Sequence, residues 1–217
     1  MQIDPETAKI AIEALKATLG VIAEKAKPTV REQILKWKTT HLAEKLQANI
    51  RQIGKITTIA SREASTIDEI YYPSRIKLGK SNSRLVTFAS DLIASNSRVT
   101  LIIGTAGQGK SVFLRYLCLR DLDIQGHLPL FIELRKIDGA TTLKNLLHEH
   151  VASLGIGEDD PEEVFKALLK SGKTRLFLDG YDEISREYSL RTKAEITRLV
   201  RDYEKIEILI TSRPGAI

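Results

Sequence analysis

The 217-residue sequence predicts an α/β fold in which a mainly parallel sheet with flanking helices follows an α-helical N-terminal module. From residue 99 onward, short apolar runs alternate with helical patterns, as is typical of parallel strands joined by crossover helices. The first part of the chain carries only helical apolar periodicity. We therefore expect a helical module over residues 1–69, a linker and lead-in over 70–98, and an α/β domain over 99–217.

The N-terminal module is expected to contain amphipathic helices. Asp4 and Pro5 favour a helix start, with Asp as the N-cap and Pro in the first turn. Apolar residues then recur at spacings of three and four as far as Pro28, which breaks the helix. These apolar residues are Ala8, Ile12, Leu15, Leu19, Ile22 and Ala26. A second helix is predicted over 29–52 and a third over 55–70. Such helices must bury their apolar stripes against the α/β domain or against another copy.

Between the module and the sheet, the chain is expected to be mostly extended. Pro73 disfavours helix at Tyr72, so residues 71–76 are predicted to be extended. A loop is predicted over 80–83 and a short helix over 85–94. The later strands are predicted over 99–103, 129–134, 174–179 and 206–211. The helices of the α/β domain are predicted over 110–121, 142–153, 161–171 and 190–204.

Composition indicates a globular protein without disulfides. Hydrophobic residues make up 42% and charged residues 28% of the chain, which is ordinary for a globular domain. No apolar stretch approaches the roughly 20 residues that a membrane-spanning helix needs. Cys118 is the single cysteine, so a disulfide framework and a cysteine zinc site are excluded. Since the N-terminus also lacks the basic region of a signal peptide, we expect a cytoplasmic protein.

The net charge of +5 is unevenly distributed along the sequence. Residues 1–90 hold 15 Lys/Arg against 9 Asp/Glu, a net charge of +6, whereas residues 91–217 hold 18 against 19, a net charge of −1. A basic half could contact nucleic acid or an anionic membrane surface. Because the basic residues are spread along amphipathic patterns, a solvated helix face is the favoured interpretation, with nucleic-acid binding as the alternative.

Residues 104–111 read Gly-Thr-Ala-Gly-Gln-Gly-Lys-Ser and match the phosphate-loop pattern G-x-x-x-x-G-K-[ST]. The glycines allow a tight turn in which backbone N–H groups point at phosphates. Lys110 is expected to reach the β and γ phosphates, and the Ser111 hydroxyl to ligate Mg²⁺. The start of the following helix adds its positive end to the same site. The predicted nucleotide-binding residues here are Gly104, Thr105, Ala106, Gly107, Gln108, Gly109, Lys110, Ser111 and Val112.

A second group of polar residues, Asp-Gly-Tyr-Asp-Glu at 179–183, follows an almost entirely apolar run. Such a run is expected of a strand that is covered on both faces, and ligands of open α/β sheets bind at the carboxyl ends of the strands. Asp179 is therefore predicted to hold Mg²⁺ opposite Ser111. Asp182 and Glu183 are predicted to orient and deprotonate an attacking water.

A third apolar run ends in Thr-Ser-Arg-Pro at 211–214. This placement at a carboxyl edge predicts that Arg213 approaches the γ-phosphate and stabilises charge in the transition state. The alternative is a surface arginine that is salt-bridged at a strand end.

These three segments together resemble the NACHT family of signal-transduction ATPases. Residues 104–111 match its phosphate loop, including Ala at the third position, and 179–183 match its acidic motif. Residues 211–214 look like its sensor segment. The Tyr-Tyr-Pro sequence at 71–73 resembles the extended stretch that leads into the domain, which implies that Tyr72 lies near the adenine. The resemblance covers residues 70–217.

The resemblance implies a P-loop NTPase fold of the ASCE/STAND type, with the sensor strand between the phosphate-loop strand and the acidic-motif strand. It implies ATP or ADP and Mg²⁺ as cofactors, and a P-loop ATPase that acts as a switch in NLR-like antiphage defence. Self-association through the N-terminal helices and the ATPase domain is also implied. NACHT proteins continue into a lid, a winged-helix domain and a C-terminal sensor of a phage or stress trigger. We therefore expect the N-terminal part of a longer protein, with weak ATPase activity of its own.

Two other classes of function remain open at this point. One is a conventional P-loop enzyme or motor, which would need an acceptor site or a basic groove, and residues 91–217, at a net charge of −1, show neither. The other is an interaction scaffold in which the nucleotide is structural.

Overall fold

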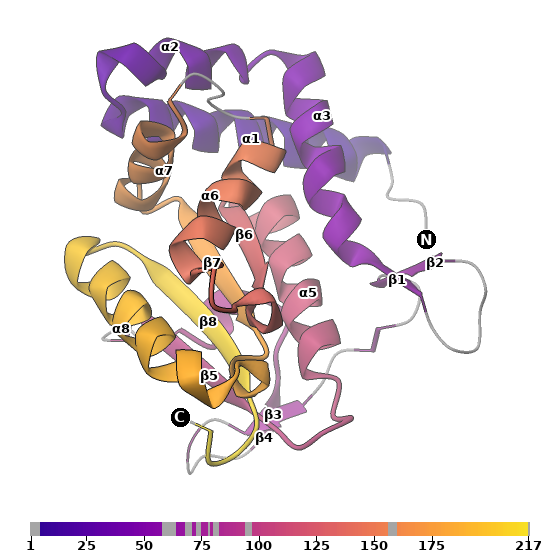
Figure 1. Ribbon diagram of the computed structural model, residues 1–217. Coiled ribbons are helices and arrows are strands. Elements are labelled where there is room, and N and C mark those ends of the chain that lie inside the picture. The colour runs from indigo at the N-terminus through magenta and orange to yellow at the C-terminus, as the bar shows by residue number, and fades with distance from the viewer. Residues whose placement is uncertain are drawn as a thin grey trace.

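The computed structural model describes residues 5–57, 64–67, 71–72, 75–77, 79, 83–93, 97–155 and 160–216. Its centre is a parallel sheet with the strand order β5-β8-β7-β6 (Figure 1). The strands are β5 (Val99–Ile103), β6 (Leu128–Glu133), β7 (Thr174–Asp179) and β8 (Glu207–Ser212). The order confirms that the sensor strand, β8, lies between the phosphate-loop strand and the strand that ends in Asp179.

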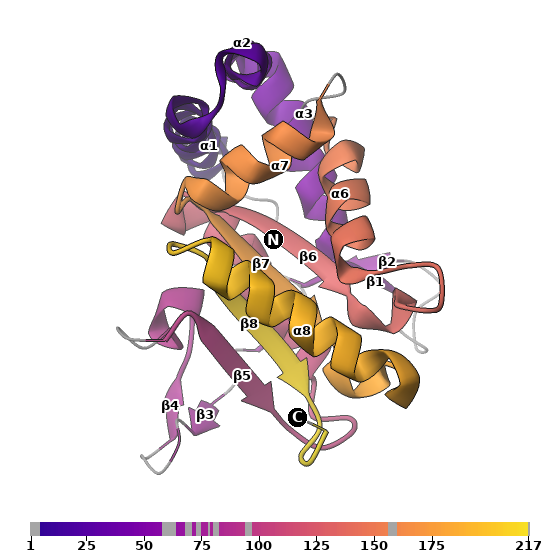
Figure 2. The ribbon, with the colours of Figure 1, turned by 60° about the vertical axis from the view of Figure 1, so that its left-hand side comes forward.

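The two faces of the sheet pack against different helices because side chains alternate along each strand. Phe131, Phe177 and Leu209 point to one face and pack with helix α5 (Lys110–Arg120). The intervening residues pack with the helices that cover the other face, including α8 (Arg186–Asp202), which crosses the sheet in Figure 2. The sheet is therefore covered on both faces, as the apolar run before Asp179 predicts.

The predicted helices of the α/β domain are confirmed, with shifts at their ends. Helix α6 (Leu143–Ser153) begins where the Thr142 hydroxyl accepts from the Asn145 N–H, and α7 (Pro161–Lys170) begins with an Asp160 cap. A π-helical turn, η3 (Asp121–Gln125), extends α5. Helix α8 begins four residues earlier than predicted. Among the described residues, no helix is both long enough and apolar enough to cross a membrane.

Residues 5–51 form three helices, α1 (Pro5–Lys25), α2 (Pro28–Lys36) and α3 (Thr40–Arg51), so the prediction of one helix over 29–52 is wrong. The chain turns after α2, where the Trp37 side chain is only 9% exposed. A Cβ atom on Gly155 would lie 3.1 Å from the Trp37 ring, so the indole packs directly on the backbone after α6. The turn thus places a large aromatic side chain in the core, which helical spacing alone did not reveal.

The apolar stripes of these helices are buried within the chain itself. Leu15, Leu19, Ile22, Ile34 and Leu46 are each at most 2% exposed and belong to the same core cluster as one face of the sheet. The helices lie over α6 and α7 at one end of the molecule (Figure 1). Of the two partners that the sequence left open, the α/β domain therefore covers these stripes.

The helix predicted over 55–70 is wrong at residues 55–57 and 64–66, which form strands. A 3-10 turn, η1 (Gln52–Gly54), leads into strand β1 (Lys55–Thr57), which pairs with β2 (Ala64–Thr66) in an antiparallel hairpin. The isoleucine and threonines of this segment favour an extended backbone, because β-branched side chains fit a strand better than a helix. Residues 58–63 and 68–70 lie outside the described residues.

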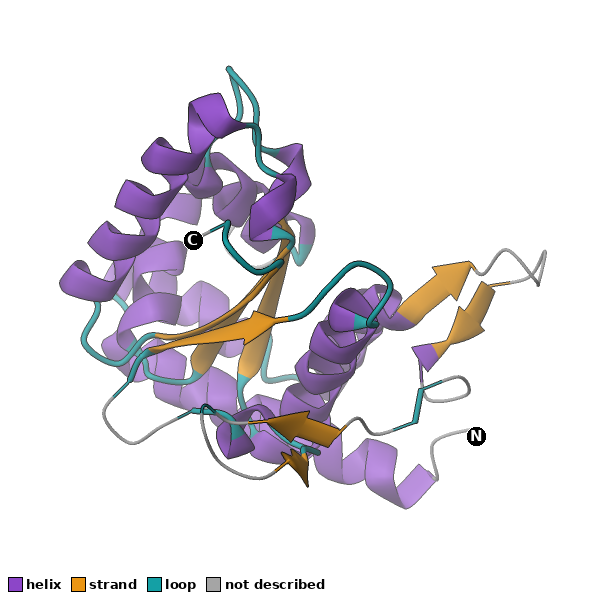
Figure 3. Ribbon diagram, turned by 90° about the horizontal axis from the view of Figure 1, so that it is seen from below, coloured by secondary structure: helices purple, strands orange, loops and turns teal. Residues whose placement is uncertain are grey.

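The helix predicted over 85–94 is also wrong. Strand β3 (Arg75–Lys77) pairs with β4 (Ser83–Leu85), and only a short 3-10 turn, η2 (Ala89–Asp91), follows. The Asp91 carboxylate accepts hydrogen bonds from the Thr87 and Phe88 N–H groups, which fixes a local turn instead of a helix. Both hairpins lie outside the main sheet (Figure 3). The loop predicted over 80–83 is described only at Ser83, which opens β4.

A buried ion cluster joins three elements at the amino end of the sheet. Arg175, which is 2% exposed, pairs with the fully buried Asp121 of η3 and with Glu207 at the start of β8. Burial raises the pKa of Asp121 to about 7, and the neighbouring Arg175 limits this rise. The end of α5 and the starts of β7 and β8 are thereby held together.

We expect Arg175→Leu to lower the free energy of unfolding by about 3–5 kcal/mol at pH 8, because it leaves a carboxylate buried without its cation. The loss should shrink as the pH falls below the raised pKa of Asp121, since the protonated acid is neutral. The double variant R175L/D121L should recover much of the loss, because an apolar pair replaces a buried ion pair. Urea denaturation followed by circular dichroism measures this, and equal losses in the single and double variants would contradict it.

Candidate functional site

The glycine-rich loop lies between β5 and α5 and leaves the amino end of α5 open. Gly107 and Gly109 have φ angles of +78° and +73°, which only glycine adopts without strain. The first helical hydrogen bond runs from the Phe113 N–H to the Gly109 carbonyl, 2.8 Å. The N–H groups of the first helical turn therefore have no partner within the helix and form an anion site. They belong to Lys110, Ser111 and Val112.

The loop is held in shape by its own polar groups. The Thr105 N–H donates to Gln108 Oε1 over 2.7 Å, and the Lys110 ammonium donates to the Thr105 carbonyl over 3.0 Å. A Cβ atom on Gly104 would lie 2.6 Å from Gln108 Oε1, so a larger residue there would displace the Gln108 amide from its hydrogen bond to Thr105. Lys110 thus lies over the loop backbone, where a phosphate bound by the loop would meet it.

Asp179 is fixed by the neighbouring strand. The Thr211 hydroxyl donates to Asp179 Oδ1 over 2.6 Å and accepts from the Gly180 N–H over 2.8 Å. Thr211 is fully buried, so its hydroxyl depends on these two hydrogen bonds in place of bonds to solvent. The sequence placed Thr211 in the sensor segment without giving it a role. Its position at the end of a buried strand, next to the strand of Asp179, was the available signal.

A small cavity of about 120 Å³ brings the predicted metal ligands together. Its lining residues are Ser111, Arg115, Glu133, Arg135, Asp179 and Glu183. A hydroxyl and carboxylates are the oxygen donors that Mg²⁺ prefers, so the residues present fit this ion. Ser111 and Asp179 are 68 residues apart in the sequence. They lie on the same cavity because the amino end of α5 is next to the carboxyl end of β7.

Sequence reasoning missed a carboxylate with three cations at the same edge. Glu133 ends β6, opposite Asp179 in the strand register, and is paired with Arg115, Arg135 and Lys136 at 2.9, 3.0 and 3.1 Å. Burial acts to raise the pKa of Glu133, but these cations outweigh it and the net pKa is lowered. The signal was the position of Glu133 directly after an apolar strand, as for Asp179.

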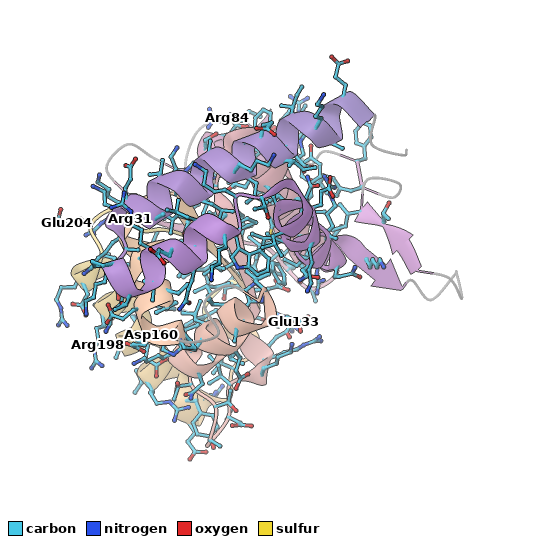
Figure 4. The ribbon with its side chains drawn as sticks, turned by 90° about the horizontal axis from the view of Figure 1, so that it is seen from above. Arg31, Arg84, Glu133, Asp160, Arg198 and Glu204 are labelled. Carbon is cyan, nitrogen blue, oxygen red and sulfur yellow. The ribbon has the colours of Figure 1, made fainter. Side chains whose placement is uncertain are left out.

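Figure 4 shows the position of this edge in the whole molecule. Glu133 lies at the opposite side of that view from Arg198, near the carboxyl end of α8, and from Glu204, just after that helix. The charged edge of the sheet is thus separate from that end of the molecule.

The other two predicted catalytic residues, Asp182 and Arg213, bind each other. Asp182 Oδ1 accepts from the Arg213 N–H over 2.9 Å, and Asp182 Oδ2 pairs with Arg213 Nε at 2.8 Å. The Asp182 side chain is only 8% exposed, and neither residue lines the cavity around Ser111. Glu183 does line it. The two acidic residues therefore have different surroundings. Glu183 lies on the cavity with Ser111 and Asp179, the predicted metal ligands, whereas Asp182 binds Arg213, the residue that follows β8.

The structure does not bring Tyr72 to the loop. Tyr72 is 87% exposed, whereas the Tyr71 ring packs at a tilt against Tyr116 of α5 with 4.4 Å between ring centroids. Pro73 lies outside the described residues. A larger cavity of about 740 Å³ runs from Gly104 and Lys110 along β5 to β3, which is a usual size for a ligand site. The predicted adenine contact of Tyr72 remains a prediction.

Comparisons with known proteins cover the region that contains this site. The model of the family described as NACHT domain matches residues 98–217, just over half of the chain. The matched region contains the whole parallel sheet, the glycine-rich loop, Asp179 and Thr211. No curated protein matches the chain.

We expect Thr211→Val to lower the free energy of unfolding by about 1–3 kcal/mol, because the Gly180 N–H loses its buried partner. It should also weaken any Mg²⁺-dependent nucleotide binding, because Asp179 loses the donor that orients it. The matched control is Thr197→Val on the exposed side of α8, where a change within about 0.5 kcal/mol is expected. Calorimetry with and without Mg²⁺ measures the binding. An unchanged Mg²⁺ dependence in T211V would show that Thr211 does not orient the metal ligand.

Proposed function

Because the chain belongs to the NACHT domain family, we propose that it is an ATP-binding and ATP-hydrolysing molecular switch of an intracellular signalling and defence protein. The coarser part, a nucleotide-binding P-loop NTPase, follows from family membership. The preference for ATP, the antiphage role and nucleotide-dependent oligomerisation are the parts that need testing.

One observation supports the proposal above all others. Ser111, at the amino end of α5, and Asp179, at the carboxyl end of β7, line the same small cavity. A phosphate chain on the open N–H groups of α5 therefore has a hydroxyl and a carboxylate beside it. Mg²⁺ bound there neutralises phosphate charge during phosphoryl transfer.

The chain's own residues have distinct tasks in this mechanism. Lys110 binds the phosphates, and Thr211 orients Asp179 through the 2.6 Å hydrogen bond. Glu183, exposed at the rim of the cavity, orients and deprotonates the attacking water. Arg115 and Arg135 supply positive charge to the same cavity, whereas Arg213 is committed to Asp182.

As a switch, the protein holds an assembled state with ATP and is reset by hydrolysis. The proposal includes self-association and a response to a phage or stress trigger, which the family resemblance suggests. Support for a switch comes from the N-terminal helices, which share one core with the nucleotide-binding sheet and so can respond to its state.

We expect Lys110→Ala to weaken ATP binding by at least about tenfold, because it removes a cation that faces the phosphates. The fold should stay intact, since the Lys110 side chain bonds only to the exposed loop among the contacts described. Lys193→Ala on the exposed face of α8 is the matched control. Isothermal calorimetry measures both, and equal ATP affinity in K110A and the parent would refute the site.

We expect Glu183→Gln to leave ATP affinity unchanged and to reduce single-turnover hydrolysis by about 100-fold, because the amide cannot accept a proton. Asp182→Asn should reduce hydrolysis less, because it loosens the ion pair with Arg213 without removing a group from the cavity. The same rate in E183Q and the parent would assign water activation to another carboxylate.

A further inference from the structure

The turn that follows the N-terminal helices packs closely against the end of α5. The turn η1 ends at Gly54, which is buried, and a Cβ atom there would lie 2.6 Å from Leu119 Cδ1. Leu119 is itself only 5% exposed, so its side chain has little room to move away. A second contact, the ion pair between Arg51 and Asp123 at 2.5 Å, lies farther along, in η3.

We call the contacts of Gly54 with Leu119 and of Arg51 with Asp123 the seat of the N-terminal helices. Arg115 connects this seat to the cavity lined by Ser111 and Asp179. It lies one helical turn after Ser111, so both side chains are on one face of α5. Its Nη1 donates to the Ile53 carbonyl over 2.8 Å, and its Nη2 donates to Glu133 Oε1 over 2.9 Å. The guanidinium also lies 4.8 Å from the centre of the Phe131 ring. One side chain thus touches the end of the N-terminal module, the sheet and the cavity.

Arg115 and Glu133 also separate two cavities. Both line the 120 Å³ cavity of Ser111 and Asp179, and both line a cavity of about 390 Å³ beside Ile53. Among the described residues, they are the ones that the two linings share. This pair therefore connects the N-terminal turn on the Ile53 side with the Ser111 side.

The two arginines on Glu133 are held unequally. The Arg115 side chain is 21% exposed and is fixed by the contacts to Ile53, Glu133 and Phe131. The Arg135 side chain is 61% exposed and is tied to Glu133 at 3.0 Å. If Arg135 turned from Glu133 toward a phosphate, Arg115 and Lys136 would still pair with Glu133. The position of Glu133, and with it that of Arg135, depends on Arg115.

We propose that Arg115 is a positioning residue through which the N-terminal helices hold Glu133 and Arg135 at the phosphate cavity, so that the seating of these helices on α5 sets the preference for ATP over ADP. This inference rests on the proposed function as a nucleotide switch. Coupling between sites is reciprocal, so ATP in turn stabilises the seated helices. The terminal phosphate adds negative charge that the arginines at the cavity favour.

The first experiment measures ATP and ADP affinity in Mg²⁺ for the 217-residue chain and the variants Arg115→Ala and Arg115→Lys. Both variants should reduce the ratio of ATP affinity to ADP affinity by about tenfold, within the usual range of coupling energies. Lysine keeps the charge but lacks the rigid planar fork by which the guanidinium donates to Ile53 and Glu133 from two separate nitrogens. If R115K restores the parental ratio, Arg115 acts by charge alone and the proposal is wrong.

The second experiment disturbs the seat without touching the cavity. Gly54→Ala should push the turn from α5 and lower the ratio as R115A does, whereas the double variant G54A/L119A should restore it by making room. Leu119→Ala alone reports the loss of packing. Lys27→Ala is the matched control, because it removes the ion pair of the module with Glu163 of α7 and leaves the contacts with α5 and η3 in place. A ratio lowered equally by K27A would exclude a specific path through Arg115.

Hydrogen exchange supplies a readout that a purely structural role would not change. ATP should slow exchange of the backbone amides over residues 50–57 in the parent and in K27A, but not in R115A or R115K. Displacement of this segment in G54A with a parental affinity ratio would overturn the proposal. If the parent and K110A bind ATP equally, the proposed function fails instead, and the two failures are thereby distinguished.

Discussion

Helix α5 has to satisfy three different partners along its length, and the rest of the structure depends on this constraint. Its first turn keeps N–H groups open for phosphates because Gly109 supplies no side-chain cap. Its middle carries Arg115, which binds both the sheet edge and the N-terminal module. Its end continues into η3, where Asp121 joins the buried cluster of Arg175. A shift of this helix would therefore change the phosphate loop, the contacts of Arg115 and the buried Asp121–Arg175 pair together.

The carboxyl edge of the sheet shows how similar acidic groups acquire different tasks from their partners. Asp179 accepts a hydrogen bond from a buried threonine and stays available on the cavity side. Asp182 is neutralised by Arg213, and Glu133 by three cations. Glu183 is left exposed on the cavity that Ser111 and Asp179 also line. The cations that pair with Glu133 lower its pKa, which makes this carboxylate a poor base.

The packing of the N-terminal helices bears on regulation. Their apolar side chains lie in the same core as β6, β7 and β8, so the module is not an independent appendage on a linker. Removing it would expose apolar surface and also remove the Ile53 carbonyl from Arg115. Point variants at the seat, such as those at Gly54, separate these two effects, whereas deletion of the module would combine them.

The sequence by itself determined the alternating strands and helices, the phosphate loop and the placement of Asp179 after a buried strand, because these follow from local periodicity and residue type. The strand order came from the family resemblance and was confirmed. Only the tertiary structure decided that Trp37 ends α2, that residues 55–57 and 64–66 pair as strands, and that Asp182 binds Arg213. It also showed that Arg115 and Glu133 meet at the cavity. These features depend on contacts between residues far apart in the chain, whose partners are set by the folded packing and not by local sequence.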